Sequence, residues 1–346
     1  AGFETAAFTT NPLVSADVNL DQGFLTYRSF EWQKASSILA PIEDWLEERE
    51  GERFFLYLHL IDPHDPYEPD PEHAQRFAPP PPEGWQAQDQ TTLAAQLTGK
   101  EGFDSTALAA LVQYNRSLYD AEIATIDAAL GSFFAELDQR GLLEHTLVAV
   151  TSDHGEEFLE HGLVGHSLQL HEECVRVPLI LAGPGIPAGK RSSGCVQNRL
   201  VGTTLLRLAR VDPGSFGEAQ SLFEETADDA AVLSSTMRGM IYDPLQDRWL
   251  LAGELHGMRQ GNWQLHWATG SRESGGEIVR LWDLGADPQA RADVASEHED
   301  IVQRLKSDLA RRIAAEKVGH APTLSEGEAE TERLRAAGYL GGEEDD

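Results

Sequence analysis

The fold and the chemistry of this chain meet in residues 147–171, LVAVTSDHGEEFLEHGLVGHSLQLH. Four apolar residues come first, and the 21 positions that follow hold four of the chain's twelve histidines and four carboxylates. A short apolar run that ends in polar residues is typical of a buried strand in an α/β sheet, and such sheets bind ligands at the carboxyl ends of their strands. We therefore expect Asp153 and His154 to lie at a strand end, with Gly155 allowing a sharp turn.

An adjacent Asp and His offer one oxygen and one nitrogen ligand, a set that suits Mn, Zn, Mg or Ca at a catalytic site. The two cysteines, Cys174 and Cys195, lack the paired spacing of a structural zinc site, and one disulfide or two thiols are both possible. The alternative is that Asp153 caps a helix and the histidines are solvated loop residues. The pair at a strand end, with His161 and His166 in the glycine-rich loop beyond it, favours a ligand site. The acids at 156, 157 and 160 are interpreted as residues of a helix first turn or as partners of the site.

A second strand end carries similar residues. Residues 52–67, ERFFLYLHLIDPHDPY, contain a nearly continuous apolar run that prolines close, which predicts a buried parallel strand followed by a loop. His64 stands just past this strand, with Asp62, Asp65 and Tyr67 around it. The alternative is a proline-rich turn whose histidine is merely exposed. Two strand ends that each present His and Asp favour a shared cleft.

The remaining pattern predicts an α/β fold with a mostly parallel sheet flanked by helices, and a smaller C-terminal antiparallel sheet plus helix. Three- and four-residue apolar steps predict a long helix over 104–140, and the first fourteen residues read as a helix end leading into a short strand. The sequence also predicts a surface excursion over 78–104, a strand near 176–185, helices over 199–210 and 299–317, and a meander over 256–284. The domains expected are 1–222 (catalytic), 223–317 (C-terminal subdomain) and 318–346 (acidic tail). Three tryptophans of the C-terminal sheet could line a sugar site or pack the sheet, and packing is favoured: Trp263, Trp267 and Trp282.

The charge balance is strongly acidic, with 58 acidic against 27 basic residues and a net charge of −31. Such a chain repels nucleic acid and anionic membranes. The excess acid indicates solubility or a salty habitat, or a divalent cation that offsets it locally. Hydrophobic residues make up 41% of the chain, and no apolar stretch approaches the roughly 18 residues that a membrane helix needs. We therefore expect a globular protein with no nucleic-acid partner and no transmembrane segment in this chain.

Together these segments resemble the sulfatases of the alkaline-phosphatase superfamily, most closely the bacterial type. The pattern SDHGEE…EHG…GH…RVPLI is highly specific to that group, and the resemblance covers most of the chain apart from 70–105 and the meander. The segments stand in the family's order: 2–14 (GFETAAFTTNPLV), 20–24 (LDQGF), 54–67 (FFLYLHLIDPHDPY), 119–131 (YDAEIATIDAALG), 151–185 and 334–342 (LRAAGYLGG).

The resemblance implies a role for several residues. Asp153 and His154 would be the second half of the shell of one divalent metal ion, with Ca favoured by family and Mn, Mg or Zn possible. His166 matches the basic position that binds the sulfate oxygens. His64 matches another basic contact to the ester, which aids departure of the leaving oxygen. A transferring sulfuryl group spreads charge over its oxygens, so a metal ion and cationic donors stabilise it. The residues expected to support these groups are Asp62, Glu156 and His161.

The family's other site residues have no match here. It begins with a strand that carries two metal-binding acids, followed by a Cys/Ser-x-Pro-x-Arg segment whose first residue becomes the nucleophile, by formylglycine modification if any. Cys195 in CVQNR lacks the proline and follows the metal pair, so we interpret it as structural, and Ser152 is no substitute nucleophile. We expect an N-terminally truncated piece that does not turn over alone.

The substrate implied is a small sulfate ester or a sulfated carbohydrate, and the family suggests an exported location, periplasmic or extracellular. Two alternatives stay open. A phosphatase or phosphonate monoester hydrolase of the same superfamily would use the same metal and histidine contacts. A non-catalytic relative would bind sulfated glycan without turning it over, although a decayed site should have lost some of these ligands.

Overall fold

A computed structural model describes residues 2–82, 105–166, 168–214, 221–223, 231–236, 240–243, 248–271 and 276–316. The described residues form two compact units that divide after Leu143. We call them the N-terminal unit (residues up to 143) and the C-terminal unit (from residue 144). The three domain ranges expected from the sequence, 1–222, 223–317 and 318–346, stay predictions, and the tail over 318–346 lies outside the described residues.

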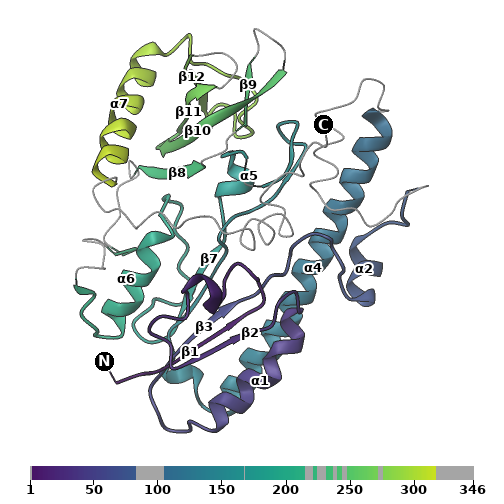
Figure 1. The fold of residues 1–346 in the computed structure, drawn as a ribbon, viewed down its shortest axis with the longest axis vertical. Helices are drawn as coiled ribbons and strands as arrows, with labels where there is room; N and C mark the ends of the chain where they lie inside the picture. Colours follow the sequence, from purple (N-terminus) through teal and green to yellow (C-terminus); the bar gives the residue numbers. More distant parts are fainter. Residues whose placement is uncertain are drawn as a thin grey trace. The chain divides into compact units, whose positions relative to one another are not determined.

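The N-terminal unit is built on a three-stranded parallel sheet with the strand order β2-β1-β3 (Figure 1). Ala6 of β1 faces Thr26 of β2 and Leu56 of β3 across the ladder. The strand predicted from residue 54 is therefore confirmed, whereas the helix end predicted before β1 is wrong, since Gly2 and Phe3 are not helical. The elements are β1 (Glu4–Thr9), η1 (Ala16–Val18), β2 (Thr26–Ser29), α1 (Ala35–Glu47), β3 (Phe54–His59), α2 (Pro71–Phe77) and α4 (Ser105–Gln139).

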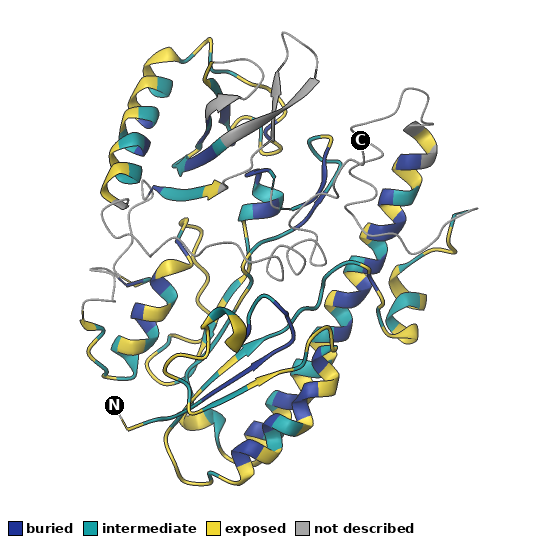
Figure 2. Cartoon of the chain, in the orientation of Figure 1, coloured by how far each residue is buried: buried dark blue, intermediate teal, exposed yellow. Residues whose placement is uncertain are grey.

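One face of this sheet packs against α1 and α4. Phe8 of β1 is fully buried and lies in a cluster with Ile38 and Ile42 of α1 and Phe133 of α4. Figure 2 shows the buried residues of α4 recurring along the helix between exposed ones, as the three- and four-residue apolar steps predicted. The sequence predicted this helix over 104–140, and it spans residues 105–139.

The C-terminal unit begins with two short strand pairs, both antiparallel. Thr151 at the end of β4 pairs with Leu179 at the start of β7. A parallel pair would need a long crossover, usually a helix, but the link between β4 and β7 holds a small hairpin and a four-residue helix. This pair therefore departs from the parallel arrangement expected. The elements are η2 (Leu143–His145, at the division), β4 (Val148–Thr151), β5 (Glu157–Phe158), β6 (Val164–Gly165), α5 (Glu172–Val175), β7 (Leu179–Ala182) and α6 (Arg199–Leu208).

The second part of the C-terminal unit is an antiparallel sheet covered by a helix, which confirms the predicted meander. Its strands run in the order β12-β11-β10-β8, and β9 pairs with β10. Met258, Leu265 and Leu281 of the sheet pack against Leu305 and Leu309 of the helix. Trp263 and Trp267 border this cluster and Trp282 is 7% exposed, so the packing interpretation of these residues is confirmed. The elements are β8 (Val232–Thr236), β9 (Met240–Asp243), β10 (Arg248–Gln260), β11 (Trp263–Ser271), β12 (Ile278–Asp283) and α7 (Glu299–Glu316).

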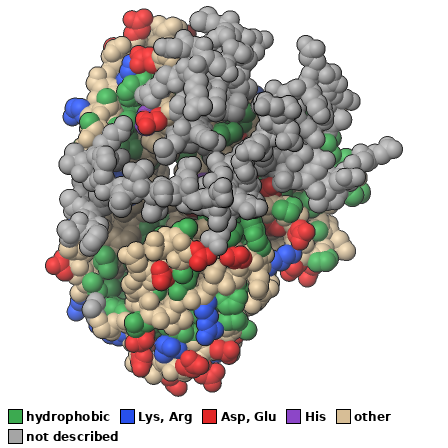
Figure 3. All heavy atoms as spheres, in the orientation of Figure 1, with side chains coloured by type: hydrophobic (Ala, Val, Ile, Leu, Met, Phe, Trp, Pro, Cys, Tyr) green, Lys and Arg blue, Asp and Glu red, His purple; other side chains and the backbone are tan. Residues whose placement is uncertain are grey.

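The described surface is that of a strongly charged protein. On the face drawn in Figure 3, acidic side chains are scattered over the described part, with lysines and arginines among them. Among the described helices, none combines the length and apolar character that crossing a bilayer requires. The excursion predicted over 78–104 lies outside the described residues from position 83 onward.

The core of the N-terminal unit predicts the response to one truncation. Ile42 is fully buried in the cluster beneath the parallel sheet, so Ile42→Ala should lower the free energy of unfolding by about 2–5 kcal/mol. The same substitution at Ile123 of α4, which is 43% exposed, should change it by less than about 0.5 kcal/mol. Urea unfolding of both variants measures the difference, and equal losses would contradict this assignment of the core.

Candidate active site

Strand β4 delivers Asp153 and His154 to the start of a turn, as the sequence predicted. The turn is held from two sides: Asn198 Nδ2 donates a 2.8 Å hydrogen bond to the Ser152 carbonyl, and Ser152 Oγ donates to the His154 carbonyl at 2.6 Å. Residues 153–156 are not helical, so the alternative in which Asp153 caps a helix is wrong.

The ring of His154 has a defined tautomer. Its Nδ1 lies 2.9 Å from the Gly155 carbonyl oxygen, which can only accept, so Nδ1 carries the proton and the neutral ring has its lone pair on Nε2. This Nε2 lies 3.9 Å from Asp153 Oδ2, and the two side chains are 33% and 59% exposed. The pair therefore presents one nitrogen and one oxygen donor at the strand end.

These two donors suit a divalent cation, since imidazole nitrogen and carboxylate oxygen form the mixed set that such ions accept. Among the described residues, no group of three or more His, Cys, Asp or Glu side chains is placed to hold a metal ion. Asp153 and His154 thus fit part of a metal shell and do not form a complete one within the described structure.

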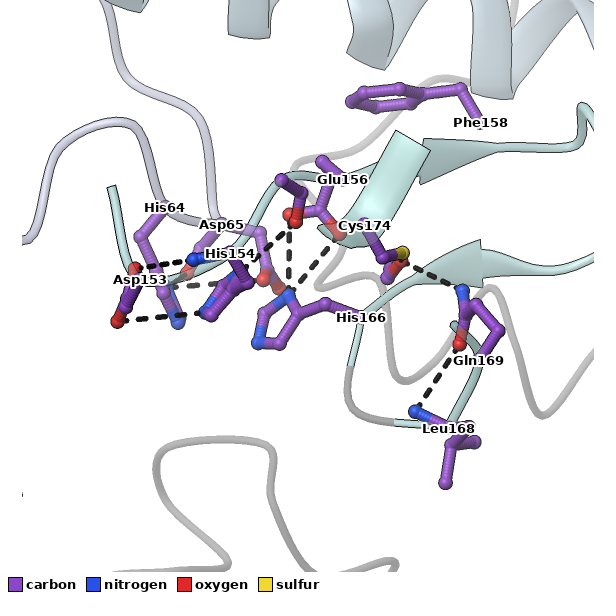
Figure 4. A network of polar contacts seen from close by, with 12 residues as sticks. His64, Asp65, Asp153, His154, Glu156, Phe158, His166, Leu168, Gln169 and Cys174 are labelled. Atoms are coloured by element: carbon purple, nitrogen blue, oxygen red, sulfur yellow. Dashed lines mark hydrogen bonds and ion pairs between the residues drawn. The ribbon is translucent and has the colours of Figure 1, made fainter. Parts of the chain in front are cut away.

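His166 lies directly beside His154. The two rings stack with centroids 4.0 Å apart and an interplanar angle of 23° (Figure 4). His166 Nδ1 donates to the carboxylate of Glu156, at 3.2 Å from Oε1 and 3.3 Å from Oε2. Glu156 has a side chain only 4% exposed, and that of His166 is 11% exposed. Glu156 therefore fixes the orientation of His166, and any further proton of this ring must sit on Nε2.

The acids at positions 156, 157 and 160 do not form a helix first turn, because residues 157–158 are strand β5. Glu157 is fully buried, and its Oε1 accepts hydrogen bonds from the backbone N–H groups of His161 (3.0 Å) and Leu163 (3.1 Å). Burial above all raises the pKa of Glu157 to about 7. This carboxyl therefore closes the loop that leads to His166.

His161 contacts a different set of residues. Its Nε2 lies 3.1 Å from Glu173 Oε2, and its ring stacks on that of His171 with centroids 3.6 Å apart. Burial lowers the pKa of His161, but the hydrogen bond and charge of Glu173, with the charges of neighbouring acids, outweigh it and raise the pKa. His161 thus belongs to a buried histidine cluster with His171 and His266.

The sequence did not single out His171 or His266. The His266 ring centroid lies 4.9 Å from that of His171, and its Nε2 is the donor to the Leu170 carbonyl at 3.0 Å. Burial lowers the pKa of His266 to about 4 and lowers that of His171 strongly. The available signal was the alternation in β11, which places Gln264 and His266 on one face, where both contact Leu170.

In the N-terminal unit, His64 follows β3 as predicted and its side chain is 14% exposed, so the merely exposed alternative is wrong. Its Nδ1 lies 2.6 Å from the Asp65 carbonyl, which again makes Nδ1 the donor. The ring of Trp32 lies edge to face with His64, with centroids 5.8 Å apart. Asp62 Oδ2 accepts a 2.9 Å hydrogen bond from Ala35 N at the start of α1, and burial above all raises the pKa of Asp62.

Both cysteines lie in the C-terminal unit. Both are free thiols, which answers the question of a disulfide. Cys174 is buried, and burial raises its pKa. Cys195 is exposed, and the interpretation that it is not the nucleophile stays a prediction.

Comparison with known proteins gives a family. A family model described as Sulfatase matches residues 2–211. Arylsulfatase K from Homo sapiens is 30% identical over 209 residues, which cover 59% of this chain and 38% of the relative. The "Multifunctional alkaline phosphatase superfamily protein PehA" from Trinickia caryophylli is 32% identical over 181 residues, covering 47% and 35%. The chain therefore spans less than two fifths of the length of these relatives.

Solved structures share the fold. The structure of BT4656 in complex with its substrate, D-glucosamine-2-N,6-O-disulfate, superposes with a TM-score of 0.65 at 18% identity, over 94% of this chain and 82% of that one. The phosphonate monoester hydrolase of Agrobacterium radiobacter gives a TM-score of 0.57 at 21% identity, over 82% and 60%. At these identities the likeness concerns the fold alone.

The tight turn after His154 predicts that replacing Gly by Ala changes stability in opposite directions at Gly155 and at Gly131. A Cβ on Gly155 would lie 2.1 Å from the Glu173 carbonyl oxygen, so Gly155→Ala should cost about 1–3 kcal/mol of stability. A Cβ on Gly131, inside α4, meets nothing within 4 Å, so Gly131→Ala should stabilise the chain by about 0.5–1 kcal/mol. Thermal unfolding measures both, and a stable Gly155→Ala variant would contradict the close approach.

The buried histidine cluster predicts acid sensitivity. The pKa of His266 is about 4 in the folded chain and about 6.5 when unfolded, so its stabilising contribution is present above pH 6.5 and is lost as the pH falls towards 4. Removing this titration in His266→Gln should reduce the loss of stability over that range by up to about 3 kcal/mol. Urea unfolding at several pH values measures the slope, with His145→Gln, an exposed position, as the control. Equal slopes in the wild type and His266→Gln would refute the prediction.

Proposed function

Because this chain belongs to the sulfatase family, we propose that it forms part of a metal-dependent sulfuric ester hydrolase. The chain spans 37% of the length of bovine arylsulfatase K, and the proposal concerns the activity of the whole protein. The observation that carries it is the arrangement of Asp153, His154 and His166, in which a metal-type donor pair lies against a histidine held by a buried carboxylate.

His166 supplies the contact to the ester. With Nδ1 committed to Glu156, the doubly protonated ring donates from Nε2, and the carboxylate lies within 3.2 Å to balance its charge. A donor fixed before the substrate arrives is worth most where charge builds up on the sulfuryl oxygens, because no reorganisation is needed during the reaction. Glu156 is thus a positioning residue for His166.

Asp153 and His154 would hold the metal ion, which when bound supplies positive charge next to the sulfuryl oxygens. Calcium is proposed on the family resemblance, with Mn, Mg and Zn as alternatives. The carbonyl of Gly155 keeps the lone pair of His154 on Nε2, the nitrogen next to Asp153. A formylglycine nucleophile is likewise part of the proposal for the whole protein.

His64 is proposed to assist the leaving oxygen. Its Nδ1 proton is directed to the Asp65 carbonyl, so proton donation to an ester oxygen must come from Nε2 of the imidazolium form. The Asp65 carboxylate lies close by, with Oδ1 3.9 Å from Nδ1. The Trp32 ring packs edge to face against the His64 ring.

The substrate class proposed is a small sulfate ester or a sulfated carbohydrate, and BT4656, one of the structural neighbours, has a disulfated glucosamine as its substrate. An exported location is proposed on the family resemblance. The second candidate is a phosphatase or phosphonate monoester hydrolase of the same superfamily, a superfamily that the name of PehA states and whose fold the Agrobacterium radiobacter enzyme shares. A non-catalytic sulfated-glycan-binding relative is the third.

The test measures how fast the whole gene product hydrolyses three p-nitrophenyl esters, those of sulfate, phosphate and phenylphosphonate. We expect the sulfate ester to be hydrolysed fastest, chelation to abolish turnover, and His166→Ala to lower kcat/KM by about 10²–10³. His145→Ala serves as the control, since residue 145 is exposed. The 346 residues alone should not turn over the sulfate ester.

Fastest hydrolysis of the phosphonate ester would move the assignment to the second candidate. Sulfate binding without hydrolysis of any ester by the whole gene product would favour the non-catalytic relative.

A further inference from the structure

One face of helix α4 contacts the loop that carries His64. Tyr119, Glu122 and Thr125 stand three residues apart, so they share one face of the helix. The Tyr119 ring meets that of Tyr67 edge to face at 5.6 Å. One turn further on, Thr125 Oγ1 accepts hydrogen bonds from the Asp70 backbone N–H at 3.2 Å and from His73 at 3.0 Å.

Glu122 is the middle residue of the three and contacts the loop at Glu68. It is 5% exposed, and its Oε1 accepts a 2.6 Å hydrogen bond from the backbone N–H of Glu68. Its second oxygen, Oε2, is buried and has no hydrogen-bond partner within the described structure. The carboxyl therefore binds the backbone at the far end of the turn over 64–68.

The loop is anchored at two further points. Asp62 accepts the hydrogen bond from Ala35 N, and Lys34 Nζ donates to the Glu68 carbonyl oxygen. The charges of both residues also act on the pKa of Glu122, which Asp62 raises and Lys34 lowers. Burial has the largest effect and raises the pKa of Glu122 to about 7. A buried carboxyl is costly, so a hydrophobic residue would serve better if packing were the only requirement.

We propose that Glu122 is a positioning residue for His64. The carboxyl of Glu122 fixes the backbone of the 64–68 turn and thereby the position of the His64 imidazole. The proposal rests on the role proposed above for His64 at the sulfate ester. Glu122 acts through the loop and makes no contact with the substrate itself. Its contribution differs from that of Thr125, which holds residues beyond the turn.

The test measures amide hydrogen exchange by NMR in the 346-residue chain and in three variants. In Glu122→Ala, exchange at Glu68 should speed up by about tenfold or more, as expected for loss of a buried hydrogen bond. In Glu122→Gln, protection at Glu68 should be retained, because the amide oxygen still accepts. In Thr125→Val, the matched control, exchange should speed up at Asp70 and stay unchanged at Glu68.

A second readout is the response of the His64 imidazole to inorganic sulfate. The wild type should show a saturable shift, and the sulfate concentration at half saturation should rise about tenfold in Glu122→Ala but not in Thr125→Val. Exchange at Glu68 within twofold of the wild type in Glu122→Ala would overturn the proposal. If sulfate does not shift the His64 imidazole resonance in the wild type, the result counts against the proposed function. The exchange data would still decide the role of Glu122. Should Glu122→Ala fail to fold, loss of protection at Glu68 in a folded Glu122→Gln would overturn it.

Discussion

The hydrogen bond from Gly155 N–H to the Cys174 carbonyl oxygen, 2.7 Å long, brings the end of β4 against the segment that returns to β7. This approach is so close that a Cβ at position 155 would overlap the Glu173 carbonyl. The intervening loop must then fold back on itself, and Glu157 closes it through two backbone N–H groups. The stacking of His166 on His154 follows from this closure, because both rings are attached to the ends of the same constrained segment.

The hydrogen-bond partners of the histidines separate their chemical roles. A backbone carbonyl accepts the Nδ1 proton of His154 and leaves a lone pair on Nε2, which is the requirement for a metal ligand. A carboxylate accepts the Nδ1 proton of His166, which suits the role proposed for this ring, donation from Nε2 to the ester. Deeper in the same unit, His266 has a pKa lowered to about 4 by burial and stays neutral, which is a structural role.

Much of this arrangement could be predicted from the sequence, because apolar runs that end in Asp and His mark strand ends without reference to distant residues. The positions of His64, Asp153 and His154 followed from that rule. The antiparallel pairing of β4 with β7 did not, since strand direction depends on how the intervening loop folds. The partners of the loop residues were hidden for a similar reason: Glu122 lies 54 residues from Glu68, and His266 lies 96 residues from Leu170.

We propose that the Gly155 carbonyl sets the tautomer of His154 so that Nε2 and Asp153 together can bind a divalent cation. Nitrogen-15 NMR of the chain labelled at histidine tests it most directly, by recording the two ring nitrogens of His154 before and after addition of Ca²⁺ or Mn²⁺. We expect a proton on Nδ1, and an Nε2 resonance that the cation alters in the wild type but not in Asp153→Asn. A ring protonated at Nε2, or an Nε2 resonance that ignores the cation, would contradict it.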